Sequence, residues 1–136
     1  MTWRFTVQGQ PPSVNHLYKV GVGEVKDRFG QTVYGADGNP KKFRRMVKTE
    51  GVEIYQEGVG WVVKAARPSD WVPGPRIRIR YWFHLKRDID CDNALKALND
   101  AIARALGVND RAFLPCVVDK TTGNAKPFVE VEIETL

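Results

Sequence analysis

The sequence contains few of the residues that build zinc clusters, disulfide frameworks or membrane spans. It has two cysteines, Cys91 and Cys116, and two histidines, His16 and His84, in 136 residues. One disulfide at most is possible, and the absence of a CxxC pair argues against a structural zinc site. No apolar run approaches the roughly 20 residues of a membrane-spanning helix, and the first residues lack the apolar stretch of a secretory signal. We therefore expect a cytoplasmic protein with free thiols and no membrane partner.

What the sequence does have is material for a core and an excess of positive charge. Hydrophobic residues make up 43% of the chain, which predicts a folded protein, and its length fits a single domain over residues 1–136. The 21 Lys and Arg residues outnumber the 16 Asp and Glu residues, for a net charge of +5, which favours a polyanionic partner. The charges are unevenly placed: residues 41–48 hold five cations and no acid, whereas residues 88–92 hold three carboxylates.

Hydrophobic periodicity predicts an α/β fold of the α+β type, a small mixed β-sheet with helices packed on it. Apolar residues alternate from Trp3 to Val7 and again from Arg76 to Leu85, which is the period of a half-buried strand. If the second strand continued, Asp88, Asp90 and Asp92 would share one face. Residues 13–40 are typical of a long loop, and helix formers dominate from 41 to 67, interrupted by glycines that weaken one helix or separate two.

The second half of the chain predicts one more helix and two more strands. Apolar residues recur at three- and four-residue steps up to Leu106, with Asp92 as the expected N-cap and Gly107 at the C-terminal end. Strands are expected at about 113–121 and 127–134, joined by a Gly-Asn turn.

Aspartates two positions apart suit a divalent cation. Carboxylate oxygens are the ligands that Mg²⁺ prefers, and the ion keeps open positions for water and phosphate oxygens. Such a cation lowers the pKa of a bound water and stabilises the charge that develops during phosphodiester hydrolysis. Lys96, one helical turn after Asp92, is placed to contact the scissile phosphate.

Several of these features also have a simpler interpretation. A single Asp at a strand-to-helix junction is more often a cap or a turn, whereas three together favour a site. Lys96 and Asp100 are spaced as a surface ion pair, and the cations of 41–48 are compatible with a solvated face. Cross-strand pairing and contact with nucleic acid are equally compatible with the alternating charges of two strands, Arg76, Arg78 and Arg80 against Glu130, Glu132 and Glu134.

Two motifs resemble a known family. Asp90-x-Asp92-Asn93-x-x-Lys96-x-x-x-Asp100, followed by Asp110 in a short loop after the helix, resembles the signature of the RusA family of Holliday junction endonucleases. Pro11-Pro-Ser-Val-Asn15 is similar to the opening Pro-Pro-Ser-x-Asn of that family. The resemblance implies a small mixed α/β fold, a homodimer, and nicking of four-way DNA junctions on two strands with Mg²⁺, for which Mn²⁺ substitutes.

The resemblance also implies residue roles. Asp90, Asp92 and Asp110 match the catalytic, metal-binding carboxylates, Lys96 matches the catalytic lysine, and Asn93 and Asp100 match supporting positions. Asp88 departs from the pattern, because the family commonly has a basic residue there. Contacts with DNA are expected from Asn15, Lys41, Lys42, Arg44, Arg45, Lys48 and Arg87.

We therefore expect a Mg²⁺-dependent, structure-selective endodeoxyribonuclease that resolves Holliday junctions by paired symmetric nicks in recombination and repair. A twofold homodimer would present two sites in matching geometry. Two alternatives stay open: a broader branched-DNA or flap nuclease with the same site, and a non-catalytic DNA-binding protein whose acids are structural. The expected location is the cytoplasm, at the nucleoid, and genes of this kind often travel with phages and prophages.

Overall fold

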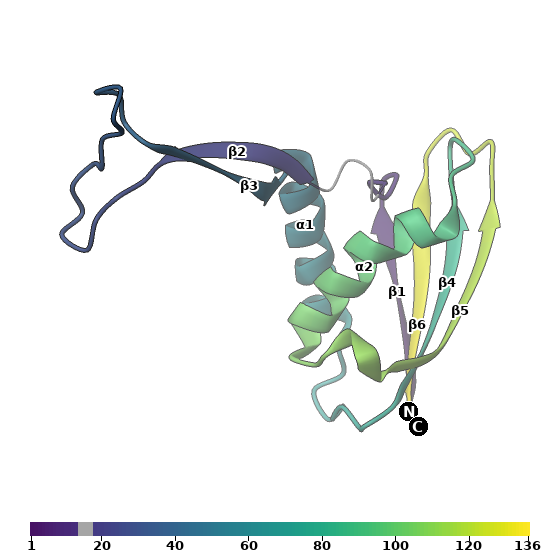
Figure 1. The fold of residues 1–136 in the computed structure, drawn as a ribbon. Helices are drawn as coiled ribbons and strands as arrows, with labels where there is room; N and C mark the ends of the chain where they lie inside the picture. The colour runs from purple at the N-terminus through teal and green to yellow at the C-terminus, as the bar shows by residue number, and fades with distance from the viewer. Residues whose placement is uncertain (14–17) are drawn as a thin grey trace.

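A four-stranded mixed sheet forms the body, and two helices cover one of its faces (Figure 1). The computed structural model describes residues 1–13 and 18–136, with the backbone alone for 18–20, 44–46 and 93. The strands, in their order across the sheet, are β1 (Thr2–Gln8), β6 (Phe128–Thr135), β4 (Ile77–His84) and β5 (Phe113–Thr121). β4 runs antiparallel to β6 and parallel to β5. This α+β architecture confirms the predicted fold class.

The alternation of apolar residues decides which face of the sheet is covered. The side chains of Ile77, Ile79, Tyr81 and Phe83 along β4 are all buried, as are their neighbours on β1 and β6. The two helices, α1 (Glu50–Ala66) and α2 (Cys91–Leu106), pack on this face. α2 is the crossover between the parallel strands, and it ends, as predicted, at Gly107 with a positive φ of 71°.

The pairing of β1 with β6 fixes the positions of the chain termini. Thr2 lies opposite Glu134, so the N-terminus and the C-terminus are neighbours at one end of the sheet (Figure 1). β4 ends and α2 begins at the opposite end. The same end carries a two-stranded ribbon, β2 (Tyr18–Glu24) paired with β3 (Lys42–Lys48), which projects away from the body (Figure 1).

This ribbon corrects two predictions. Residues 42–48 form a strand where we expected a helix, and α1 begins only at Glu50. Residues 18–24, expected in a loop, form its partner strand. The partner is a Gly-rich segment, and the ring of Phe43 lies over Gly23, where a Cβ would come within 2.8 Å of the ring. The pairing of β2 with β3 therefore includes a contact between residues far apart in sequence, which local helix propensity cannot predict.

The segment after β4 corrects two further predictions. The strand ends at His84, and Asp90, not Asp92, occupies the N-cap position of α2. Asp92 lies in the first turn of the helix. The three acids therefore do not share a strand face, because the chain leaves the sheet before it reaches them. The closing strands confirm the predictions of 113–121 and 127–134 to within one residue.

Two of the alternating arginines of β4, Arg78 and Arg80, lie beside glutamates of β6 on the uncovered face of the sheet. Arg78 Nη1 lies 2.8 Å from Glu134 Oε2, and Arg80 Nε lies 4.0 Å from Glu132 Oε1. Arg4 makes a hydrogen bond of 2.6 Å from its Nε to the other oxygen of Glu132. Cross-strand pairing is thus the arrangement for Arg78, whereas Arg80 lies near Glu132 but its Nε has no hydrogen-bond partner among the described residues. No helix among the described residues is long and apolar enough to cross a membrane.

Candidate active site

The predicted acidic cluster begins in the loop 85–90, which joins β4 to α2 and is held by two other segments. The backbone N–H of Leu85 donates to the carbonyl of Thr121 at 2.8 Å, and Asn124 Nδ2 donates to the carbonyl of Leu85 at 3.1 Å. From the other side, the N–H of Lys86 donates to Gln10 Oε1 at 3.0 Å. Gln10 comes just before the Pro-Pro-Ser motif, so the beginning of that motif lies at the same end of the molecule as the loop 85–90.

A lysine on the edge strand fixes the end of this loop. Lys120 Nζ donates to Asp88 Oδ1 at 2.8 Å and to the carbonyl of Ile89 at 3.2 Å. The hydrogen bond with Asp88 is the main cause that raises the pKa of Lys120, and the charge of Asp90 acts in the same direction. Asp88, the acid that departs from the family pattern, is therefore the ion-pair partner of Lys120. The backbone of Ile89, just before Asp90, is hydrogen-bonded to the same lysine of β5.

Asp90 and Asp92 lie at the start of α2 with exposed side chains. The backbone of Asp90 is extended, with φ −61° and ψ 133°, and the helix begins at the next residue. The N-terminus of a helix carries partial positive charge, which stabilises nearby carboxylates. The fold thus offsets part of the repulsion between these acids, and leaves them open to solvent.

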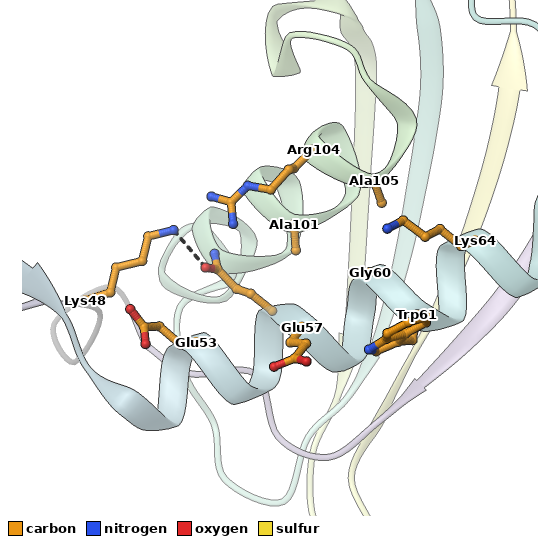
Figure 2. A pocket seen from close by; sticks show the side chains of 10 residues that line it. Lys48, Glu53, Glu57, Gly60, Trp61, Lys64, Ala101, Arg104 and Ala105 are labelled. Atoms are coloured by element: carbon orange, nitrogen blue, oxygen red, sulfur yellow. Dashed lines mark hydrogen bonds between the residues drawn. The ribbon is translucent and has the colours of Figure 1, made fainter.

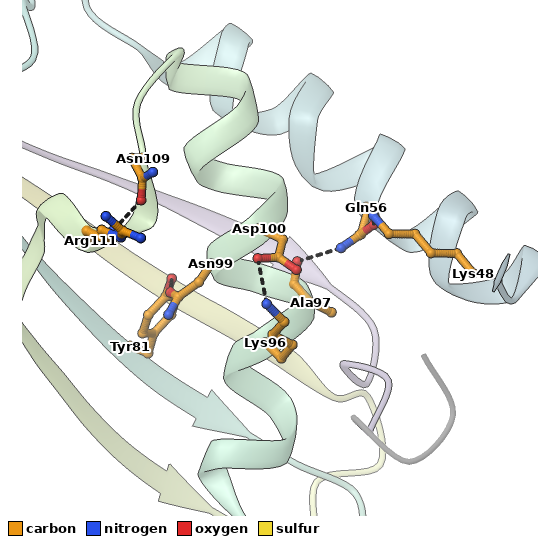
Figure 3. Close-up of polar contacts among 9 residues, drawn as sticks. All are labelled: Lys48, Gln56, Tyr81, Lys96, Ala97, Asn99, Asp100, Asn109 and Arg111. Carbon is orange, nitrogen blue, oxygen red and sulfur yellow. Dashed lines mark hydrogen bonds and ion pairs between the residues drawn. The ribbon is translucent and has the colours of Figure 1, made fainter. Parts of the chain in front are cut away.

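Lys96 lies on α2 about one turn beyond Asp92. Its Nζ is 3.3 Å from Asp100 Oδ1, the helical ion pair that the spacing predicts (Figure 3). Asp100 therefore restrains the position of the Lys96 ammonium. The side chain of Asn93, the other predicted supporting residue, lies outside the description.

Asp110 lies at the other end of the crossover. It begins a short helical turn, η2 (Asp110–Ala112), where the N–H of Arg111 donates to Asn109 Oδ1 at 3.0 Å (Figure 3). β5 then starts opposite the beginning of β4, and its end lies opposite His84. At about 3.3 Å per residue, the two ends of the sheet are on the order of 20 Å apart.

A single chain therefore does not bring all three predicted carboxylates together. Within residues 1–13 and 18–136, no three His, Cys, Asp or Glu side chains lie close enough to hold one metal ion. Asp90 and Asp92 share the start of α2, and Asp110 is separated from them by the length of that helix.

The residues predicted to contact DNA are distributed between the ribbon and the loop. Lys41 and Lys42 are exposed on the ribbon, and Arg87 is exposed in the loop 85–90. Lys48 Nζ donates to Gln56 Oε1 at 2.9 Å, and the buried Gln56 donates to the carbonyl of Ala97 at 3.1 Å, so this lysine joins the base of the ribbon to both helices (Figure 3). Asn15 lies outside the described residues, as do the side chains of Arg44 and Arg45.

A groove of about 540 Å³ lies between α1 and α2 (Figure 2). Its charged lining alternates in sign, with Lys48, Lys64 and Arg104 beside Glu53 and Glu57. Lys48 is the one predicted site residue among its described lining. The carboxylates of the motif lie outside the groove, as expected for acids that would act on a large, exposed phosphate backbone.

Three residues that hold the loop 85–90 were not predicted from the sequence: Gln10, Lys120 and Asn124. Gln10 adjoins a recognised motif, and could have been noticed there. A single lysine on an edge strand and a single asparagine in a turn carry no periodic or motif signal, because their partners lie more than 30 residues away.

The donor chemistry at the start of α2 fits a hard divalent cation. Two exposed carboxylates without histidine or thiolate ligands match Mg²⁺, which is commonly bound through one or two carboxylates and retains several waters. Cys91 lies between them but is partly buried against the core.

Comparison with known proteins gives one family match. The family described as "Endodeoxyribonuclease RusA" matches residues 30–134, which contain the whole acidic motif. No curated protein matches the chain significantly. Among solved structures, IspF of Plasmodium falciparum in complex with CDP is 9% identical, with 96% of this chain and 94% of that chain covered and a TM-score of 0.33. The 2C-methyl-D-erythritol 2,4-cyclodiphosphate synthase of Plasmodium vivax is 9% identical, with 98% and 95% covered and a TM-score of 0.35. Both likenesses are too weak to indicate a shared fold or function.

Proposed function

The chain belongs to the RusA family of endodeoxyribonucleases, and from this we propose that it resolves four-way junctions by paired nicks at two symmetry-related sites that use Mg²⁺. The family resolves Holliday junctions and is generally dependent on divalent metal, so the protein is a hydrolase that acts on branched DNA. The observation that carries the finer proposal is the presence of Asp90, Asp92, Lys96 and Asp110 within the matched residues.

We assign the metal to Asp90 and Asp92 of one subunit and Asp110 of a second copy. Asp110 lies at the far end of α2 from the other two, so the same chain cannot supply all three without rearranging its sheet. A twofold axis relates two copies so that the end of one crossover meets the start of the other, and it creates two equivalent sites. Dimerisation would then be a condition for catalysis.

The side chains at this site have distinct roles in hydrolysis. Mg²⁺ at these carboxylates would polarise the scissile phosphate and lower the pKa of the attacking water. Lys96, restrained by Asp100, places an ammonium where it neutralises charge developing on the phosphate. The water oxygen forms a bond to phosphorus, one P–O ester bond breaks, and the leaving oxygen takes up a proton.

The first test is incubation with synthetic four-way, three-way and linear DNA, with and without Mg²⁺. We expect paired cuts in the four-way junction only when the metal is present. Asp90→Asn and Lys96→Met should abolish cutting while junction binding in EDTA is retained, and Asp70→Asn, an exposed aspartate away from the motif, should cut normally. Efficient cutting of three-way or flap DNA at the same rate would support the broader branched-DNA nuclease instead.

Mixing two inactive variants tests the shared site. Asp110→Asn retains Asp90 and Asp92, and Asp90→Asn retains Asp110. A mixed dimer therefore contains one intact site if the third carboxylate comes from the second copy. We expect nicking activity to reappear on mixing. If the mixture stays as inactive as either variant alone although mixed dimers form, the carboxylates act within one chain and the assignment is wrong.

A further inference from the structure

The positive charge of this protein is concentrated in the projecting ribbon. We define the arm as residues 18–48, which comprise β2, β3 and the segment between them. The arm holds eight of the 21 Lys and Arg residues and three of the 16 Asp and Glu residues, a net charge of +5. The rest of the chain keeps 13 of each, so its net charge is zero. The net charge of the whole protein is the charge of its arm.

The three acids of the arm are engaged in local interactions. Asp27 Oδ1 accepts hydrogen bonds from the backbone N–H groups of Phe29 at 2.8 Å and Gln31 at 3.0 Å. Asp37 Oδ1 accepts from the N–H of Asn39 at 3.0 Å, which lowers the pKa of Asp37. Glu24 lies 3.5 Å from the ammonium of Lys26. These acids shape the turns, and the exposed cations Arg28, Lys41 and Lys42 face solvent.

The end of the arm is forked into two defined turns (Figure 1). The first closes at the bridge between Lys26 and Thr32, and the second at the bridge between Tyr34 and Pro40. Between them, the N–H of Val33 donates to the carbonyl of Val25 at 2.9 Å. The N–H of Val25 donates in turn to the carbonyl of Lys41 at 2.8 Å. Backbone hydrogen bonds therefore order both branches of the fork.

Each branch presents an aromatic ring to solvent. Phe29, in the first turn, is 74% exposed, and Tyr34, at the base of the second, is 62% exposed. In the described part of the chain, three of the four strongly exposed aromatic side chains belong to the arm, the third being Phe43. The guanidinium of Arg28 lies over the ring of Phe29, 4.8 Å from its centroid. One exposed ring is ordinary, but two rings at the tip of a cationic arm form a pattern.

From this arrangement we infer that the fork of the arm engages unstacked bases of branched DNA, with Phe29 as the stacking ring and the arm cations on the phosphates. Cationic surfaces with exposed aromatics bind unpaired nucleic acid, because the cations contact the backbone and every base offers a face to stack on. Apolar side chains also act as wedges between base steps that are easily unstacked. The branch point of a junction interrupts continuous base stacking, so the base pairs beside it are unstacked more easily than those of a linear duplex.

The inference extends the proposed function and concerns this chain in particular. The family match begins at residue 30, so Phe29 and the first half of the first turn lie before it. The arm leaves the body at the end that carries the loop 85–90 and the start of α2 (Figure 1). The fork itself lies at the far end of the ribbon, away from the body (Figure 1). Stacking at the fork would hold the branch point at a set position relative to Asp90, and would supply a selectivity for branched structure that exposed carboxylates cannot provide.

The test compares affinities in EDTA, where no cutting occurs, for a four-way junction and for a linear duplex of the same sequence. We expect Phe29→Ala to weaken junction binding about tenfold with duplex binding unchanged. Phe29→Trp should retain the wild-type ratio, and the fluorescence of the new Trp should be quenched by the junction and not by the duplex. Val72→Ala is the matched control, since Val72 is 73% exposed outside the arm.

Three results would overturn the inference. The ratio of junction to duplex affinity could be unchanged in Phe29→Ala, the wild type could bind both DNAs equally, or Phe29→Ala could convert a dimer to a monomer in gel filtration, in which case the ring contacts a second copy. Binding in EDTA is independent of hydrolysis. A wild-type protein that fails to cut but shows the Phe29 effect would therefore contradict the proposed nuclease mechanism and leave the stacking tip intact.

Discussion

Lys120 and Asp88 form an ion pair, 2.8 Å between Nζ and Oδ1, that joins the edge strand β5 to the loop in front of the acidic motif. The same ammonium donates to the carbonyl of Ile89, one residue before Asp90. β5 is itself paired along β4, so this contact holds the end of the loop 85–90, just before α2. Gln10 holds the beginning of the same loop, at Lys86. We regard Lys120 as a positioning residue for Asp90.

Replacement of Lys120 should therefore impair the use of metal. Residues that orient metal ligands typically contribute about 10- to 100-fold to metal affinity or activity. We expect Lys120→Met to raise the Mg²⁺ concentration for half-maximal cutting by about tenfold, and Lys120→Arg to restore part of the loss. Lys126→Ala, at another exposed lysine, is the control. A Lys120→Met protein with wild-type cutting at limiting Mg²⁺ would show that the ion pair is structural only.

The salt dependence of DNA binding should depend on the arm and not on the arginines of the sheet. Each phosphate contact contributes about 0.9 to the slope of log affinity against log salt concentration. We expect the double variant Lys41→Ala and Lys42→Ala to reduce this slope by roughly 1.8. Arg78→Ala should leave it unchanged, because Arg78 is paired with Glu134 on the uncovered face. Equal slopes for wild type and the double variant would place the DNA elsewhere.

Tyr81, which is buried, and Tyr55, which is partly buried with a buried hydroxyl, should affect stability in opposite directions when each is replaced by Phe. The hydroxyl of Tyr81 donates to Asn99 Oδ1 at 2.5 Å (Figure 3). The buried hydroxyl of Tyr55 has no hydrogen-bond partner among the described residues. Tyr81→Phe leaves an amide oxygen unpaired and should lower the free energy of unfolding by about 1–2 kcal/mol. Tyr55→Phe removes an unsatisfied group and should leave that energy unchanged or raise it. Urea unfolding of both variants distinguishes the two outcomes.

The same tyrosines make the protein sensitive to alkali. Burial raises the pKa of Tyr81 well above its ordinary value of 10.0, and burial also raises the pKa of Tyr55. Above about pH 10 the unfolded chain releases protons that the folded chain keeps, so stability falls as the pH rises. We expect the melting temperature of the wild type to fall above that pH, and to fall less steeply in Tyr55→Phe. Equal slopes would indicate that Tyr55 ionises normally in the folded protein.

The sequence predicted those parts of the fold that follow from local periodicity. Alternation identified β1, the main part of β4 and the closing strands, and three- and four-residue spacing identified α2. Periodicity failed where long-range pairing decides the structure. Residues 42–48 contain good helix formers, yet they form a strand because a partner strand lies 18 or more residues earlier. The conditional extension of β4 to Asp92 does not occur for a related reason, since Leu85 is hydrogen-bonded to Thr121 and Asn124 and the chain leaves the sheet after His84.

The candidate site was predicted in composition but not in geometry. The spacing correctly placed Lys96 about one turn after Asp92 on a helix, but it put Asp90 on a strand face and Asp92 at the N-cap, a position that Asp90 occupies. The motif could not indicate that Asp110 lies beyond the C-terminal end of α2. The distance between Asp110 and Asp90 is set by the length of the helical crossover, which the motif does not specify. The partner of Asp88 was equally hidden, since Lys120 reaches it from a strand that begins after the motif ends.

The neighbouring termini have a practical consequence. β1 begins and β6 ends at the edge of the body away from the arm and from Asp90. A fluorophore or purification tag attached at either terminus would therefore lie away from the arm, at the end of the sheet where β5 begins. Two labels, one at a terminus and one at position 29, would span the long dimension of the subunit and report by energy transfer how the fork moves when a junction is added.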